Sequence, residues 1–232
     1  MKMIKVIIVD DERLARNEIR LALTHYPDID IVAEAANADE AKLLIEKHEP
    51  ALIFLDVQMP GKSGLDLLEM LGKVPGVIFT TAFSQYAVEA FEANALDYLV
   101  KPIRDERFAK AMQKVRDRLN SDTAAQQLFI KDGNKCYFVK IADIYLVESM
   151  DNYAVLYFDD KKAFLKRSLN QMEEKLNPGA FFRINRAQII NTNFIDQVNH
   201  LPGGKLSIRL KNGRLLDLSD RQSVKFKSIN GF

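Results

Sequence analysis

The chain lacks the residues and segments that mark several common classes of protein. Cys136 is the single cysteine among 232 residues, which excludes an internal disulfide framework and fits a reducing compartment. No apolar run approaches the ~18 residues of a membrane span, and the apolar start turns acidic at Asp10, too early for a signal peptide. His25, His48 and His200 are scattered, with no cysteine or second histidine close by to complete a zinc site. We therefore expect a cytoplasmic protein with neither a membrane insertion nor a zinc site.

Charge divides the chain into two halves. Hydrophobic residues make up 47% of the sequence, enough to build a core, and the length of 232 residues suggests one or two domains. Residues 1–120 carry a net charge of −4, whereas residues 121–232 carry +5. A basic second half favours a polyanion as its partner, although a difference of this size also arises by chance.

Short apolar runs alternate with amphipathic helical patterns in the first half. The runs predict strands at 4–10, 31–35, 52–56, 77–81 and 97–101. The periodicity between them predicts helices that include 12–23, 38–47 and 104–119. Such alternation is typical of a doubly wound α/β domain, here with a five-stranded parallel sheet.

The pattern changes after residue 120. Polar residues at 121–126 indicate a short linker. Beyond it the apolar period is two, and turn residues separate the segments. The expected strands are 137–141, 144–147, 153–158, 205–210 and 214–218, and the expected helices are 168–176 and 220–229. The sequence thus predicts a first domain at 1–120 and a mostly β second domain at 127–232.

Polar residues at the ends of the expected strands indicate a phosphoryl-transfer site. Asp10 and Asp11 follow the first strand, and Asp56 ends the third. Ligands of an open parallel sheet lie beyond the carboxyl ends of its strands, so these carboxylates should converge there. Crowded carboxylates raise each other's pKa unless a cation is present. Their oxygens suit a hard divalent cation, most simply Mg²⁺.

Asp56 is the candidate nucleophile, because a carboxylate can form an aspartyl phosphate. Thr81 offers a hydroxyl donor and Lys101 a positive charge for the phosphoryl oxygens. Taken singly, each residue has an ordinary alternative: an Asp after a strand caps a helix, Thr81 ends a strand and Lys101 is a surface charge. Their order along the chain, each at a strand end, favours the site.

Residues 1–120 resemble the receiver domain of bacterial two-component response regulators. The resemblance rests on the segments Val9-Asp10-Asp11-Glu12, Phe54-Leu55-Asp56-Val57-Gln58-Met59-Pro60-Gly61, Ser63-Gly64, Thr81-Ala82 and Asp97-Tyr98-Leu99-Val100-Lys101-Pro102. It implies a flavodoxin-like fold whose Asp56 takes phosphate from a sensor histidine kinase, with help from Lys101 and Thr81.

The same resemblance implies a metal site and a switch. Asp11, Asp56 and the carbonyl of Gln58 would ligate Mg²⁺, with Asp10 just behind them in the metal site. Thr81 and Tyr98 would form the switch pair. As Thr81 is drawn toward the phosphoryl group, Tyr98 can turn its ring inward, which shifts the population between two arrangements.

Residues 127–232 resemble the LytTR DNA-binding domain, a mostly β module. The supporting segments are Ile141-Ala142-Asp143-Ile144-Tyr145-Leu146-Val147-Glu148, Phe181-Phe182-Arg183-Ile184-Asn185-Arg186, Ile189-Ile190-Asn191 and Leu216-Asp217-Leu218-Ser219-Asp220-Arg221. From the residues alone only a basic β domain follows, since residues 166–232 carry a net charge of +7. The resemblance implies that its loops enter successive major grooves of double-stranded DNA.

By position, the resemblance assigns DNA contacts to four residues: Asn152, Asn185, Arg186 and Arg221. Arginine can bind guanine and asparagine can bind adenine through paired hydrogen bonds. Family members often carry His at Asn185, Ser at Ala187 and an aromatic residue at Gln188, so the base preference stays open. A structural role within the β domain is the favoured interpretation of Arg183.

These inferences combine into a phosphorylation-activated transcriptional response regulator that is not a turnover enzyme. Phosphorylation is expected to favour a homodimer on promoter repeats, through a surface with the helix from Ser84 and the helix 104–119. One alternative is a receiver-controlled regulator that binds protein or RNA. Another is an aspartyl-phosphate hydrolase, which needs a second acid two residues after the nucleophile, where this chain has Gln58.

Overall fold

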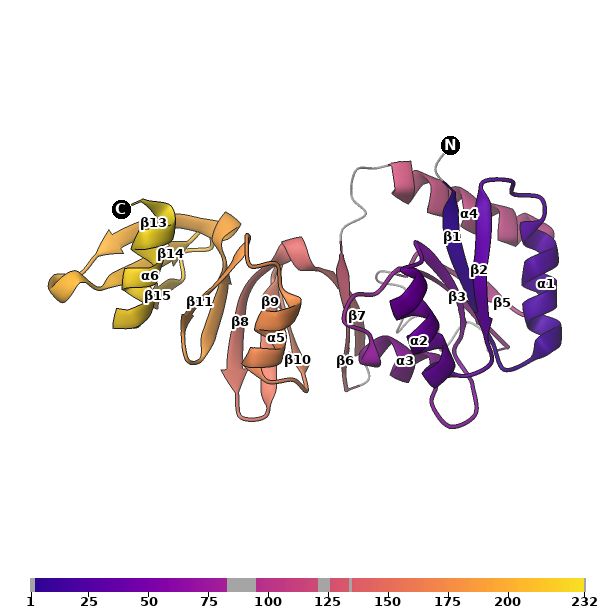
Figure 1. Cartoon of the computed structure of the whole chain (residues 1–232), viewed down its shortest axis with the longest axis horizontal. Helices are drawn as coiled ribbons and strands as arrows, with labels where there is room; N and C mark the ends of the chain where they lie inside the picture. Colours follow the sequence, from indigo (N-terminus) through magenta and orange to yellow (C-terminus); the bar gives the residue numbers. More distant parts are fainter. Residues whose placement is uncertain (1–2, 83–94, 121–125, 134, 232) are drawn as a thin grey trace. The chain divides into compact units, whose positions relative to one another are not determined.

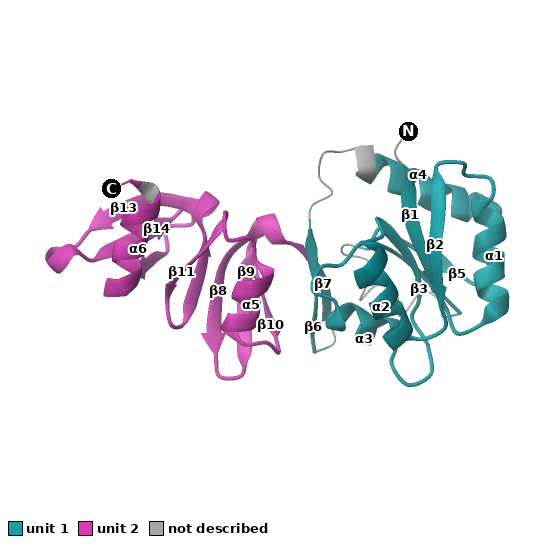
Figure 2. Ribbon diagram, in the orientation of Figure 1, with its two compact units in different colours: residues 1–138 teal, residues 139–232 magenta. Residues whose placement is uncertain are grey.

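The computed structural model describes residues 3–82, 95–120, 126–133 and 135–231. The chain divides into two compact units, Met1–Phe138 and Val139–Phe232 (Figure 2). The helix expected from Ser84 lies outside the described residues. No helix within these ranges is long and apolar enough to cross a membrane.

The first unit is built on a parallel sheet of five strands in the order β2-β1-β3-β4-β5 (Figure 1). The strands are β1 (Ile4–Val9), β2 (Ile29–Ala35), β3 (Leu52–Asp56), β4 (Gly76–Thr81) and β5 (Asp97–Val100). The helices are α1 (Arg13–Leu23), α2 (Ala38–His48), α3 (Gly64–Met70) and α4 (Asp105–Asn120). The doubly wound α/β fold expected from the sequence is confirmed.

Helices cover both faces of this sheet, so its central strands are buried on both sides. Leu55 and Phe79 face a core that includes residues of α2 and α3. Phe54 and Ile78, their neighbours along β3 and β4, face a second core with α1 and α4. Burial on both sides explains why these strands read as continuous apolar runs.

α3 begins directly beside the end of β3. Ser63 and Asp66 form a reciprocal capping box at its first turn. A Cβ on Gly64 would lie 2.2 Å from the backbone oxygen of Asp56, which is far too close. Only glycine therefore allows the helix to start this near to Asp56.

A hairpin of β6 (Gln127–Asp132) and β7 (Lys135–Lys140) follows α4. Phe129, Cys136 and Phe138 are buried in the core that contains residues of α2 and α3. The hairpin up to Phe138 therefore belongs to the first unit.

This position differs from the one expected from the sequence. Residues 127–138 were expected in the second domain, after a linker at 121–126, whereas the structure divides the chain between Phe138 and Val139. The reason is that a period of two identifies the buried face of a strand but not the core that accepts it. Most of the expected linker, 121–125, lies outside the described residues.

The second unit is mostly β, as expected. One antiparallel sheet has the strand order β10-β9-β8-β12-β11, and another has β13-β14-β15. The strands are β8 (Ile144–Met150), β9 (Tyr153–Phe158), β10 (Lys161–Leu165), β11 (Phe181–Asn185), β12 (Gln188–Asn191), β13 (Ile195–His200), β14 (Leu206–Leu210) and β15 (Leu215–Asp217). The helices are α5 (Leu169–Lys175) and α6 (Asp220–Asn230).

β6 and the strands β10 to β13 were not among the strands expected from the sequence. The turn between β11 and β12 is made by Arg186 and Ala187, neither of which is a typical turn former. β13 is half-buried to exposed and rich in polar residues, so it has little apolar alternation. Local pattern alone therefore did not reveal these strands.

Candidate functional site

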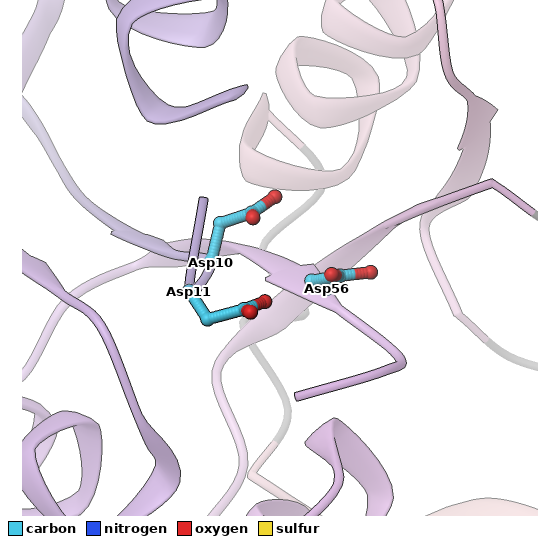
Figure 3. A group of neighbouring side chains, drawn as sticks. All are labelled: Asp10, Asp11 and Asp56. Carbon is cyan, nitrogen blue, oxygen red and sulfur yellow. The ribbon is translucent and has the colours of Figure 1, made fainter. Parts of the chain in front are cut away.

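Three carboxylates meet at the carboxyl ends of β1 and β3 (Figure 3). Asp10 and Asp11 follow β1 and Asp56 ends β3, and one oxygen of each lies within 4.8 Å of the others. Asp10 and Asp56 are buried, whereas Asp11 is exposed. The structure thus brings together the acids that the sequence placed at separate strand ends.

Lys101 supplies positive charge to this cluster. Its Nζ lies 2.7 Å from Oδ2 of Asp10 and 3.4 Å from Oδ2 of Asp56. The peptide bond from Lys101 to Pro102 is cis. One ammonium beside three carboxylates leaves an excess of negative charge, which is the setting in which a hard divalent cation binds.

The surroundings shift the pKa values of Asp56 and Lys101. Burial raises the pKa of Asp56 above its ordinary 3.8; Lys101 opposes this and the charge of Asp10 adds to it. Burial acts to lower the pKa of Lys101, but its hydrogen bond to Asp10 and the two carboxylate charges raise it overall. Asp56 therefore holds a proton more tightly than an exposed aspartate, and a cation at the site would reverse that effect.

Arg16, which sequence reasoning missed, fixes the acidic turn. Its Nη1 donates to the backbone oxygens of Asp10 (2.7 Å) and Asp11 (3.4 Å), and its Nε donates to Glu34 on β2 (3.2 Å). Oδ1 of Asp10 accepts a hydrogen bond from the backbone N–H of Glu12 (3.0 Å). These bonds hold the two aspartates in place. The sequence carries no local signal for them, because Glu34 follows Arg16 by 18 residues.

Asp11 and Asp56 open into a hollow of about 460 Å³. Asp11, Asp56, Gln58 and Lys101 line it, together with residues of α1. The backbone N–H of Gln58 points at Oδ1 of Asp56, at 3.4 Å. A ligand in this hollow would meet carboxylate oxygens and the ammonium group at the same time.

Thr81 and Tyr98 are in direct contact beside the acids. Thr81 ends β4 and is fully buried, and its hydroxyl hydrogen-bonds to the side chain of half-buried Tyr98. Burial raises the pKa of Tyr98, the hydrogen bond with Thr81 opposes this, and the charge of Asp56 adds to it. The Tyr98 ring also tilts against Phe79 with centroids 6.2 Å apart. Thr81 and Tyr98, the pair expected from the sequence, therefore contact each other, and Tyr98 also contacts the buried core through Phe79.

Two of the residues expected to contact DNA occupy neighbouring turns of the second unit. Asn152 lies in the exposed turn between β8 and β9, and Arg186 lies exposed in the turn between β11 and β12. The backbone N–H of Ser149 donates to the carbonyl of Ala187 at 2.8 Å. This bond places both turns at the same end of the five-stranded sheet.

Arg221 comes to the same end from a different element. It is exposed in the first turn of α6. Just before this helix, the backbone N–H of Ser219 donates to the carbonyl of Ile184 at 3.0 Å. The start of α6 is thereby held beside the end of β11, next to the turn that carries Arg186.

Asn185 differs from these residues because its side chain is used within the turn. Its Oδ1 accepts from the backbone N–H of Ala187 (2.9 Å), and its Nδ2 donates to Gln188 (2.8 Å) and to the carbonyl of Asp217 (3.2 Å). Arg183 supports the same turn by donating to the carbonyls of Asn185 (3.1 Å) and Arg186 (3.0 Å). Arg183 thus has the structural role favoured for it.

Glu148 connects this turn to the neighbouring strands, and sequence reasoning missed it. Its carboxylate accepts from Gln188 (2.7 Å) and, through both oxygens, from Arg214 (2.7 Å each). Arg214 also lies over the ring of Tyr157, 4.9 Å from its centroid. The pKa of Glu148 is lowered: burial acts to raise it, but the hydrogen bonds from Tyr157, Gln188 and Arg214 outweigh burial.

Comparison with known proteins connects these two sites to one family. Residues 6–113 match the model of the response regulator receiver domain, and residues 134–231 match the model of the LytTr DNA-binding domain. The transcriptional regulatory protein BtsR of Salmonella typhi is 34% identical over 241 residues, which cover 99% of this chain and 100% of the relative. The sensory transduction protein LytT of Enterococcus faecalis is 32% identical over 238 residues, which cover 97% of this chain and 98% of the relative.

The chain belongs to the LytTR family of response regulators. It joins a receiver domain to a LytTR DNA-binding domain, and this combination makes it a DNA-binding transcriptional regulator of a two-component system. The acidic cluster lies within the receiver match, and the turns around Arg186 lie within the LytTR match.

The raised pKa of Asp56 predicts that this LytTR regulator, without divalent cations, is more stable as Asp56→Asn than as wild type. Ionised Asp56 is disfavoured in the folded state, so the wild type loses stability as pH rises from below 3.8 through the raised pKa. The amide carries no charge, and Lys101 keeps its contact with Asp10. Urea denaturation with a chelator, carried out from pH 4 to 8, should show that the free energy of unfolding of Asp56→Asn exceeds that of the wild type by an amount that increases with pH.

Asp11→Asn is the matched control for this measurement. Asp11 is exposed, so its replacement should change the free energy of unfolding by only about 0.5 kcal/mol or less. A wild type that is more stable than Asp56→Asn at pH 8 in chelator would contradict the argument from burial.

Proposed function

We propose that Asp56 accepts a phosphoryl group from the phosphohistidine of a sensor kinase. The observation that carries this proposal is the excess of carboxylate charge around Asp56 at a hollow open to solvent. An oxygen of Asp56 would form the new bond to phosphorus as the bond from phosphorus to the kinase histidine breaks. Lys101 is positioned to bind a phosphoryl oxygen as a point charge.

We further propose that Asp11, Asp56 and the backbone carbonyl of Gln58 hold Mg²⁺, with Asp10 behind them. The donor set fits, because all are oxygen ligands and the carboxylates lie within 4.8 Å of one another. The cation would neutralise the charge of the transferring group. Asp10 faces Lys101 at 2.7 Å and would keep that ammonium directed into the site.

The Thr81–Tyr98 pair would convert phosphorylation into a change of surface. The side chains of Thr81 and Tyr98 share a hydrogen bond. If the Thr81 hydroxyl moves toward a phosphoryl oxygen and donates to it, Tyr98 loses this partner and its ring is released to repack. The phosphorylated state would therefore favour a different arrangement of Tyr98, which is a population shift.

We infer that the site modifies its own Asp56 and does not turn over a separate substrate. An aspartyl-phosphate hydrolase needs a second acid two residues after its nucleophile. Gln58 stands there, and an amide cannot act as a general acid or base. The LytTR match favours DNA over protein or RNA as the partner of the second unit. We expect the protein to act in the cytoplasm, where the kinase domain and the promoter are both accessible.

We predict that Asp56 is the only residue that takes up phosphate. The full-length protein is incubated with Mg²⁺ and acetyl phosphate, and the modified residue is mapped by mass spectrometry. Wild type should carry one phosphoryl group on Asp56, and chelation of Mg²⁺ should abolish it. Phosphate on the Asp56→Asn variant, or on another residue of the wild type, would refute the assignment.

Phosphorylation should raise the dimer fraction. Tyr98 is tied to α4, because Arg107 donates to the backbone oxygen of Tyr98 (2.7 Å) and to both oxygens of Asp97 (2.6 Å each). A change at Tyr98 therefore reaches the surface of α4, and a symmetric pair suits repeated half-sites on DNA. Sedimentation with and without acetyl phosphate tests this. An unchanged mass on phosphorylation, both free and on DNA, would exclude the mechanism.

The second unit would bind DNA with the sheet end that carries Asn152, Arg186 and Arg221. Arg186 has the better setting for base contact, because its backbone is fixed by Arg183 and Asn185 while its side chain is exposed. Arg221 lies in the first turn of α6, where free N–H groups attract a phosphate. A contact from Arg221 to the groove would therefore be reinforced by a contact from the helix end to the backbone.

Base contact and charge contact predict different mutant behaviour. Replacing Arg186 or Arg221 by Ala should cost about 1–3 kcal/mol on a duplex selected from a random pool and much less on a scrambled duplex. Lys166 is the matched control: it is exposed and follows β10, whose Leu165 pairs with Ala154 at the same sheet end. Lys166→Ala should weaken both duplexes alike and flatten the salt dependence by about one unit.

The affinities of each variant for both duplexes, measured at several salt concentrations, distinguish base contact from charge contact. Equal losses on the selected and scrambled duplexes for Arg186→Ala and Arg221→Ala would leave these residues only an electrostatic role.

A further inference from the structure

β7 belongs to one domain by its sequence and begins in the other by its packing. It lies entirely within residues 134–231, which match the LytTr DNA-binding domain. By packing, however, Cys136 and Phe138 lie in the core of the first unit, and Figure 2 draws the hairpin up to Phe138 in the colour of that unit. The chain therefore passes from one unit into the other inside β7, between Phe138 and Val139.

A row of aromatic rings connects the switch residue to this hairpin. Tyr98 lies 6.2 Å from Phe79, Phe79 lies 6.2 Å from Phe138, and Phe138 lies 5.1 Å from Phe129. All three pairs are tilted or edge-on, at separations where such rings attract. Phe79, Phe129 and Phe138 are buried in one close-packed core, so a shift of one ring has to be accommodated by its neighbours.

The first residue of the hairpin is anchored separately. Gln127 is buried, and its Nε2 donates to the carbonyl of Pro75 at 3.0 Å while its Oε1 accepts from Arg118 at 2.8 Å. Its backbone oxygen accepts from the N–H of Val74 at 3.0 Å. Because Gln127 is held in place, a movement of the Phe79 ring displaces the rings of Phe129 and Phe138 and does not shift the whole hairpin.

From this geometry we propose that Phe138 senses the packing of Tyr98 through Phe79 and passes it along β7 into the DNA-binding domain. The proposal rests on the proposed function and adds the route from the receiver to DNA. Phe138 is a positioning residue, since it touches neither the phosphoryl site nor DNA. When Tyr98 loses its hydrogen bond with Thr81, its ring repacks against Phe79, and the packing of the hairpin core changes at Phe138. The two states of the receiver then differ in the packing around Phe138, the last residue of β7 before the chain enters the second unit.

The test measures coupling in the full-length protein. Affinity for the selected duplex is measured with Mg²⁺ alone and with Mg²⁺ plus beryllium fluoride, a phosphoryl analogue. The ratio of the two affinities should be about 5-fold or more in the wild type. In Phe138→Leu it should fall by about 3-fold or more, while beryllium fluoride binding without DNA, followed by fluorine NMR, stays as in the wild type.

Phe108→Leu is the matched control. Phe108 is an equally buried phenylalanine of the same unit, but it packs on Phe54 and Tyr26 at the opposite face of the sheet. This variant should keep the wild-type ratio. A wild-type ratio in Phe138→Leu, or an equal loss in both variants, overturns the proposal. A wild type that binds beryllium fluoride without any change in DNA affinity counts against the proposed function, and with it against this route.

Hydrogen exchange on the unmodified protein provides a test that needs no variant to fold. Beryllium fluoride with Mg²⁺ should change the protection of the amides of residues 135–140. Equal protection with and without beryllium fluoride, in a protein whose DNA affinity does respond, overturns the route through the hairpin.

Discussion

The buried carboxylates of Asp10 and Asp56 share the ammonium group of half-buried Lys101, and the charges of this cluster do not balance. Lys101 lies 2.7 Å from Asp10 and 3.4 Å from Asp56, so one ammonium is shared between two buried carboxylates while Asp11 adds a third. Burial makes each carboxylate costly unless it is paired. These carboxylates stay close to one another only because the strand ends are held in place by the parallel sheet, by Arg16 and by the close approach of Gly64.

The parts of this site that were predictable are those determined by the direction of parallel strands. Asp10, Asp56, Thr81 and Lys101 each lie at the end of a strand or next to it, and those ends meet at one edge. The supports were not predictable, because their partners are distant in sequence. Arg16 reaches Glu34 across 18 residues, and nothing local to Arg16 indicates that contact. The close approach of Gly64 likewise becomes visible only when α3 packs on β3.

In the DNA-binding domain, too, the sequence indicated where a turn lies but not which contacts its side chains make. Asn185 was expected to reach DNA, yet its side chain bonds to Ala187, Gln188 and the carbonyl of Asp217. Glu148 organises the neighbouring strands through Gln188, 40 residues away, and Arg214, 66 residues away. Position in a motif therefore located the turn that presents Arg186. The contact of Asn185 with DNA stays a prediction, and the structure adds that its side chain also stabilises the turn.

The boundary between the two units lies inside β7, and the proposed signalling route runs through the same strand. A ligand changes the affinity of a distant site only if the two states of the protein make different contacts somewhere between the sites. A polar linker makes few contacts, so it could connect the domains while transmitting little. β7 is buried in the receiver core at Phe138 and continues directly to Val139 and Lys140. Among the described residues, it is the segment in which a change of packing in the receiver becomes a change at the start of the DNA-binding domain.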